Sequence, residues 1–189
     1  QFNTGLTKSQ QRMQAFGKAA KIAFAAMATA AVAATAAVIK MTNDTVRYSN
    51  EMRKASLATG VAVEKFQELA YAAKQEHADT SALEKGLGNL TIRLGYAGDG
   101  LETYLRYFRA LGIEYKNADG TLRNTSDVFY DIADKAHKAE LSTEELAAIT
   151  QLFGARAGRV LIPMLRKGSD WFKTMGKEAH NLGIVVETE

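Results

Sequence analysis

The chain has no cysteine, so a disulfide framework, a thiol nucleophile and a cysteine-based metal site are excluded. It has a single proline, Pro163, and abundant alanine, and both features favour helix. The three histidines, His77, His137 and His180, lie far apart in sequence, and no two of them have the spacing of metal ligands. We therefore expect a mainly α protein that binds no metal and no cofactor.

Positive charge is concentrated in the first part of the chain, although the net charge of the whole chain is only +3. Residues 1–54 carry a net charge of +6, and residues 55–189 carry a net charge of −3. A basic arm on a mildly acidic body indicates an anionic partner for the arm, such as a tube wall, nucleic acid or a membrane surface. A solvated helix with excess lysine is the alternative interpretation.

The arm contains an uncharged, alanine-rich segment. Residues 22–39 include ten alanines, and Lys18, Lys21 and Lys40 flank them. The length meets the minimum for a membrane span, but alanine gains little from transfer into lipid. Small side chains also let helix backbones approach closely, in bundles as in membranes. The residues that we expect to make helix contacts or to enter a membrane are Ile22, Phe24, Met27, Ala31, Ala34 and Val38.

Apolar residues recur at spacings of three and four through most of residues 1–54, which predicts one long helix. Such a helix would be about 65–70 Å long. It lacks the partners that would make it stable alone, so we expect it to self-associate or to pack along another chain. Insertion of this segment into a membrane is the alternative.

Residues 55–189 predict shorter helices with clear ends, packed into a compact domain. Glycine stops are expected at Gly60 and Gly154, and capping boxes begin at Ser81 and Ser142. The helix that follows Ser81 has one apolar stripe, made by Leu83, Leu87, Leu90 and Leu94.

Three further expectations concern the interior and the ends of these helices. Gly95 and the glycines of residues 98–100 are expected to interrupt the helix that begins near Ser81. Pro163 is expected to bend or break a later helix. Trp171 is expected to lie in the core.

One small β-hairpin is predicted within the domain. Two short extended runs, residues 113–116 and 121–123, flank an Asp119-Gly120 turn. No other part of the chain shows a comparable strand pattern.

Four segments carry a family resemblance in their order and spacing. They are Ala58-Thr59-Gly60-Val61 through Ala73; Leu111-Gly112-Ile113 with Asp119-Gly120 and Thr125-Ser126-Asp127-Val128; Ile132-Ala133-Asp134; and Leu152 to Gly158 with Leu161 to Leu165 and Gly168-Ser169. Together they resemble the N-terminal region shared by many tail tape measure proteins of long-tailed bacteriophages and prophages. The resemblance covers about residues 56–183.

The resemblance implies a structural role and no catalytic residues. Such proteins occupy the tail tube or tail tip of the virion, govern tail length and assist DNA delivery. The implied partners are further copies of the chain, three or six in number, tail tube proteins and tail tip or baseplate proteins, with contacts to phage DNA and the host inner membrane. Assembly would take place in the host cytoplasm, and the protein would reach the host envelope during infection. The ends of the sequence indicate a piece of a longer polypeptide.

Two clusters of charged residues in the domain allow a chemical and a structural interpretation. Asp127, Asp131 and Asp134 share one helix face, where carboxylates serve either acid–base chemistry or simple solvation near a helix start. A basic cluster indicates either nucleic-acid contact or a subunit contact on a solvated face. Its members are Arg156, Arg159, Arg166 and Lys167.

Three classes of function follow from these patterns. A structural tape measure protein that assembles through its arm fits them best. A membrane-inserting, pore-forming segment of a phage or toxin-like injection machine is the alternative, with residues 22–39 in the bilayer. An enzyme is not expected, because the sequence shows no nucleophile, no metal-ligand set and no persuasive carboxylate pair.

Overall fold

A computed structural model describes residues 47–138 and 140–185. The chain divides into two units, Gln1–Tyr48 and Ser49–Glu189, and nearly all of the described residues belong to the second. Residues 47–59 are helical, so the predicted domain boundary at residue 54 falls inside a helix. The helices that follow are α2 (Val63–Gln75), α3 (Thr80–Gly98), α4 (Glu102–Leu111), α5 (Thr125–Lys138), α6 (Thr143–Phe153), α7 (Ala155–Leu165) and α8 (Ser169–Asn181). The expectation of a mainly α protein is confirmed for the described residues.

Residues 1–46 of the predicted long helix lie outside the described residues. This holds for every residue that was expected to make helix contacts or to enter a membrane, namely Ile22, Phe24, Met27, Ala31, Ala34 and Val38. Among residues 47–138 and 140–185, no helix has the length and apolar character needed to cross a membrane.

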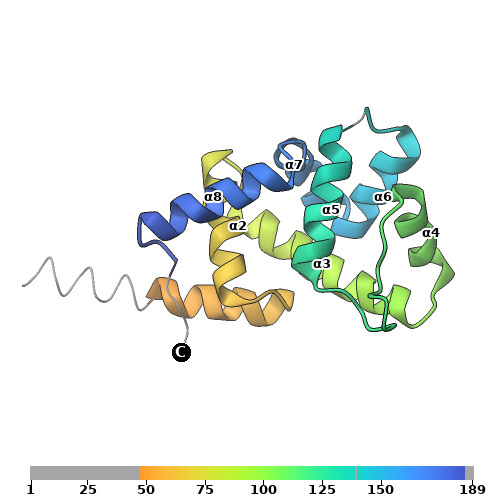
Figure 1. The fold of residues 1–189 in the computed structure, drawn as a ribbon, viewed down its shortest axis with the longest axis horizontal. Coiled ribbons are helices and arrows are strands. Elements are labelled where there is room, and N and C mark those ends of the chain that lie inside the picture. Colours follow the sequence, from red (N-terminus) through yellow and green to blue (C-terminus); the bar gives the residue numbers. More distant parts are fainter. Residues whose placement is uncertain (1–46, 139, 186–189) are drawn as a thin grey trace, which may run out of the picture. The chain divides into compact units, whose positions relative to one another are not determined.

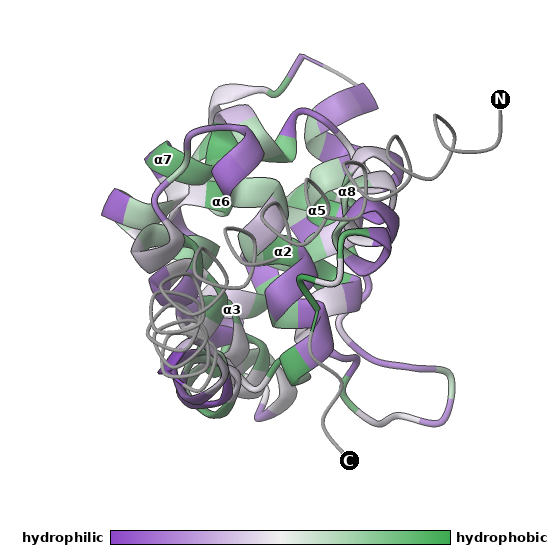
Figure 2. Cartoon of the chain, turned by 90° about the vertical axis from the view of Figure 1, so that its left-hand side faces the viewer, coloured by the Kyte–Doolittle hydropathy of each residue, from purple (hydrophilic) through white to green (hydrophobic). Residues whose placement is uncertain are grey.

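Helix α3 is the central element of the second unit, because it packs against α2, α4, α5, α6 and α7 (Figure 1). Its leucine stripe is buried as predicted, with Leu83, Leu87 and Leu90 at zero exposure. Each helix has a polar and an apolar side, so hydrophilic and hydrophobic residues alternate along the ribbons in Figure 2. The buried side of α3 therefore supplies the surface on which the other helices assemble.

The beginning of α3 differs from the prediction. Asp79, not Ser81, is the N-cap residue, and its carboxylate accepts a hydrogen bond from the Ser81 N–H at 2.9 Å. Asp79 lies two residues earlier, so Ser81 falls within the first turn and cannot cap it. The capping box at Ser142 is confirmed: the Glu145 N–H donates to the Ser142 hydroxyl at 3.2 Å, and Glu145 accepts from the Ser142 N–H at 2.7 Å.

Gly95 and Pro163 do not interrupt their helices. Helix α3 continues through Gly95 to Gly98, and Pro163 lies inside α7. Pro163 stands in the last turn of α7, where a missing N–H costs only one hydrogen bond at the end of the ladder. The interruption expected at Gly95 was wrong, and Pro163 does not break α7.

The Asp119-Gly120 turn is present, but the paired region is short. Lys116 and Leu122 form an isolated antiparallel bridge, and the Asn117 N–H donates to the Thr121 carbonyl at 2.8 Å. Within the described ranges no residue is assigned to a β-strand. The segment is a turn closed by one bridge, and the two-stranded hairpin predicted there is not confirmed.

The ion pair between Lys135 and Glu145 makes a prediction about pH. The Lys135 ammonium, at 2.7 Å, and the Ser142 donors hold the pKa of Glu145 at about 2, below its ordinary 4.5. A lowered folded-state pKa stabilises the fold above the ordinary value, and this contribution is lost as the pH falls through the window from 4.5 to about 2. We therefore expect the stability difference between the wild type and Glu145→Gln to shrink as the pH falls through this window.

Urea unfolding followed by circular dichroism at several pH values measures this difference. The change at Glu145 removes one titrating carboxylate and leaves the others, so acid effects elsewhere cancel in the comparison. A difference that stays constant across the window would contradict the assignment of this pair.

Candidate basic site on helix α7

The four basic residues predicted to cluster are distributed over both ends of α7. Arg156 and Arg159 lie in its first half, and Arg166 and Lys167 follow its last residue. A helix of this length spans roughly 16 Å. The structure therefore places two separate pairs of cations at opposite ends of α7, and they do not form the single cluster predicted.

The pair after the C-terminal end of α7 is engaged within the fold. The Lys167 ammonium lies 2.8 Å from a carboxylate oxygen of Glu76 and 5.7 Å from the centre of the Trp171 ring. Trp171 is half-buried and packs edge-on against Phe172, so its predicted place in the core was wrong. Phe172, the next residue, occupies the core position with 1% exposure. Lys167 thus covers an aromatic ring and ties the start of α8 to the end of α2.

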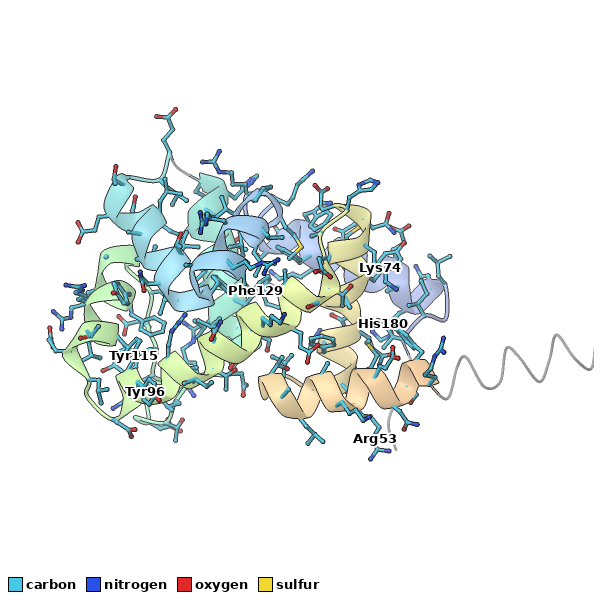
Figure 3. The ribbon with its side chains drawn as sticks, turned by 180° about the vertical axis from the view of Figure 1, so that it is seen from behind. Arg53, Lys74, Tyr96, Tyr115, Phe129 and His180 are labelled. Atoms are coloured by element: carbon cyan, nitrogen blue, oxygen red, sulfur yellow. The ribbon has the colours of Figure 1, made fainter. Side chains whose placement is uncertain are left out.

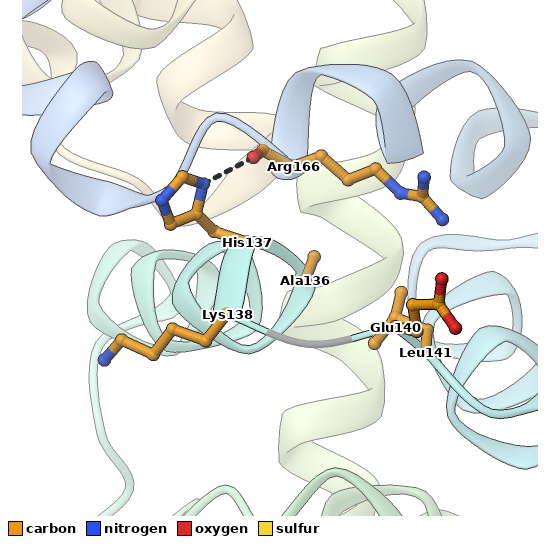
Figure 4. A pocket seen from close by; sticks show the side chains of 6 residues that line it. All are labelled: Ala136, His137, Lys138, Glu140, Leu141 and Arg166. Atoms are coloured by element: carbon orange, nitrogen blue, oxygen red, sulfur yellow. Dashed lines mark hydrogen bonds between the residues drawn. The ribbon is translucent and has the colours of Figure 1, made fainter.

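Arg166 borders an open cavity of about 580 Å³ beside the end of α5. The His137 Nδ1 atom lies 2.7 Å from the Arg166 carbonyl oxygen (Figure 4). In Figure 4 the Arg166 side chain extends to the same side as Glu140, and Lys138 extends to the other side. This contact between the His137 ring and the Arg166 backbone links the end of α5 to the end of α7.

Of the pair at the N-terminal end of α7, Arg156 borders a second cavity, of about 420 Å³, between α3 and α7, whereas the Arg159 Nε atom donates to the Ala155 carbonyl at 2.9 Å. Its walls include Ser81, Lys85 and Asn89 from α3 and Arg156 from the first turn of α7. Lys85 and Asn89 were not among the residues predicted to form a site. Lys85 lies four residues after Ser81, and Asn89 lies four residues after Lys85, so the sequence spacing already puts the three side chains on one face of α3.

Two of the three aspartates on α5 have structural roles. Asp131 accepts from the Arg123 guanidinium at 2.6 Å. Asp134 accepts from the Ser169 N–H at 2.8 Å and from its hydroxyl at 2.9 Å, so it caps α8 from another helix. Partial burial acts to raise the pKa of Asp134, but these Ser169 bonds and nearby lysines outweigh it and lower the pKa. Asp127 is exposed near the start of α5.

A polar seam joins α2 to α8. Glu68 is 7% exposed and lies 3.1 Å from the His180 Nε2 atom, and the Lys65 ammonium approaches the same carboxylate at 2.8 Å. The Tyr71 hydroxyl donates to Glu178 at 3.0 Å. Figure 3 shows His180 beside these helices. These bonds hold the last turns of α8 against α2, and α8 crosses α2 in Figure 1.

Among the residues that the structure describes, no three His, Asp or Glu side chains are grouped so as to hold a metal ion. Comparison with known proteins adds no assignment: no protein-family model, no curated protein and no solved structure matches this chain.

Proposed function

We propose that this chain is a structural segment of a phage tail tape measure protein. It would occupy the tail tube or tail tip, govern tail length and assist delivery of DNA. The observation that carries the proposal is that the segments resembling this family meet one another in space. Asp134 of the third segment accepts both the N–H and the hydroxyl of Ser169 from the fourth.

A second meeting point involves the first and second segments. The Thr91 hydroxyl on α3 donates to the Thr59 carbonyl and lies 2.7 Å from the Thr125 hydroxyl. Thr59 has no exposed surface, and Thr125 is 5% exposed. Gly60, with φ of +67°, takes the left-handed conformation that ends the preceding helix there. The segments that carry the resemblance therefore contact one another within one helical domain. This supports a shared fold as the cause of the resemblance.

The charged side chains of this body serve its architecture. Lys135 pairs with Glu145, Lys167 with Glu76 and Arg123 with Asp131. These ion pairs link separate helices and loops, which is the arrangement expected of a rigid structural protein. We accordingly propose a structural role with no catalytic turnover.

The proposed role of the arm, residues 1–54, is assembly with other chains. A long alanine-rich helix over residues 1–54 would associate with the same helix in other copies, giving a homo-oligomer of three or six chains. Tail tube and tail tip proteins would surround it, and phage DNA and the host inner membrane would be met during infection.

Substituting glutamate for Ala31 or Ala34 is expected to disrupt assembly and to leave the body folded. Each change places a charge on the face where we expect the arm helices to meet, and a desolvated unpaired charge is costly. Light scattering after size-exclusion chromatography measures the number of chains. Gln151→Glu, which adds the same charge at an exposed position of α6, is the control. An unchanged number of chains in both arm variants would count against this proposal.

Membrane insertion of residues 22–39 remains the second candidate, favoured by the uncharged run and its flanking lysines. Flotation of the chain with liposomes distinguishes the two. Recovery of all protein in the aqueous fraction would remove this candidate.

A further inference from the structure

We propose that the cavity between the first turns of α3 and α7 binds a phosphate group, with Lys85 and Arg156 supplying the positive charge. This site does not depend on the proposed tape measure role. Two elements form the cavity. One is the face of α3 that carries Ser81, Lys85 and Asn89, and the other is residues 154–157, at the start of α7.

The two walls of the cavity are held in fixed positions. The Asn89 Nδ2 atom donates to the Phe153 carbonyl at 2.9 Å, and an Arg93 guanidinium nitrogen donates to the Leu152 carbonyl at 2.8 Å. Both carbonyls belong to the last residues of α6, immediately before the cavity. Helix α3 thereby fixes the α6–α7 joint, and the groups that line the cavity need little reorganisation to receive a ligand.

Gly154 allows this close approach. Its φ is +85°, and a Cβ atom at this position would lie 2.6 Å from Asn89 Nδ2. No side chain caps the first turn of α7 that follows. The first backbone N–H groups of α7 therefore have no side-chain acceptor in the described part of the chain.

The charge of the cavity is positive. Neither Lys85 nor Arg156 forms an ion pair with any carboxylate in the described part of the chain. The one acid in the cavity wall, Asp79, accepts from the Ser81 N–H and so faces its own helix. Two cations therefore face the cavity with their charge uncompensated by an adjacent carboxylate.

The donor set matches a phosphate. A guanidinium presents a planar fork of N–H donors, and an ammonium adds a compact charge, so together they satisfy several oxygens of one tetrahedral dianion. The volume of about 420 Å³ exceeds that of a single phosphate, which leaves room for the group to which the phosphate is attached. Phosphates of a nucleic-acid backbone and free polyphosphate share this chemistry.

The test measures binding of two probes to the full chain at low salt. Calorimetry reports the affinity for sodium tripolyphosphate, and fluorescence anisotropy reports the affinity for a short labelled single-stranded oligonucleotide. In the double variant Lys85→Gln with Arg156→Gln, we expect the affinity for at least one probe to fall roughly tenfold, because two charge-assisted contacts are lost. Both side chains are exposed, so the fold is retained, as circular dichroism verifies.

A matched control separates this site from a general effect of charge. Arg106→Gln with Lys177→Gln removes the same charge from exposed positions elsewhere, and its affinities should stay within about twofold of the wild type. A loss confined to tripolyphosphate, or larger for it, would identify free polyphosphate as the ligand source, and a loss at least as large for the oligonucleotide would identify nucleic acid. If the cavity variant weakens binding no more than the control does, or if the wild type binds neither probe, the proposed site is wrong.

Discussion

Replacing Phe129 with alanine is expected to lower the free energy of unfolding by about 3–5 kcal/mol. Phe129 has no exposed surface, and it lies in the interior of the body in Figure 3. Its ring contacts Phe153 of α6 edge-on at 5.9 Å between centres and Phe172 of α8 at 5.1 Å. One truncation therefore removes packing between three helices at once. Domains of this size have total stabilities of about 5–15 kcal/mol, so the loss is a large fraction.

Urea unfolding followed by circular dichroism measures the effect. Phe129→Leu is the matched control, since it keeps an apolar side chain and should cost less than about 1.5 kcal/mol. Equal costs for the two variants would show that the apolar volume of leucine does not replace the aromatic ring at this site. A cost for alanine below about 1 kcal/mol would contradict the packing described for α5, α6 and α8.

Gly158→Ala should destabilise the body, whereas Gly95→Ala should stabilise it. A Cβ atom at Gly158 would lie 2.8 Å from the Thr150 Cα atom, so α7 would have to move away from the backbone of α6. We expect a cost of about 1–3 kcal/mol for this overpacking, even after the better helix propensity of alanine is counted. A Cβ atom at Gly95 would meet nothing within 4 Å, and the expected gain is about 0.5–1 kcal/mol.

Both variants make the same chemical change inside a helix. Opposite signs of their changes in the free energy of unfolding would therefore come from the steric contact at Gly158. Thermal or urea unfolding of both proteins gives the comparison. If Gly158→Ala were as stable as Gly95→Ala, the close approach of α6 and α7 would not exist in solution.

The sequence predicts those features that depend on neighbouring residues. The leucine stripe of α3, the Ser142 capping box and the glycine ends at Gly60 and Gly154 all follow from local spacing, and the structure confirms them. The displaced cap of α3 is a local error, because an aspartate two residues before Ser81 takes the position first.

The features that the sequence does not predict depend on contacts between distant residues. Asp134 was placed on a solvated acidic face, yet it caps a helix 35 residues further along the chain. Asn89 binds a carbonyl 64 residues away, and this contact is what sets the cavity beside Lys85. No local pattern encodes which residue a short polar side chain will reach across the fold.

The seam between α2 and α8 limits how early this domain can fold during synthesis. Glu68 and Tyr71 of α2 contact His180 and Glu178, which lie 112 and 107 positions later in the chain. Chains are made from the N-terminus, so α2 leaves the ribosome well before α8 exists. The side of α2 that α8 covers therefore stays in contact with water until nearly the whole domain has been synthesised.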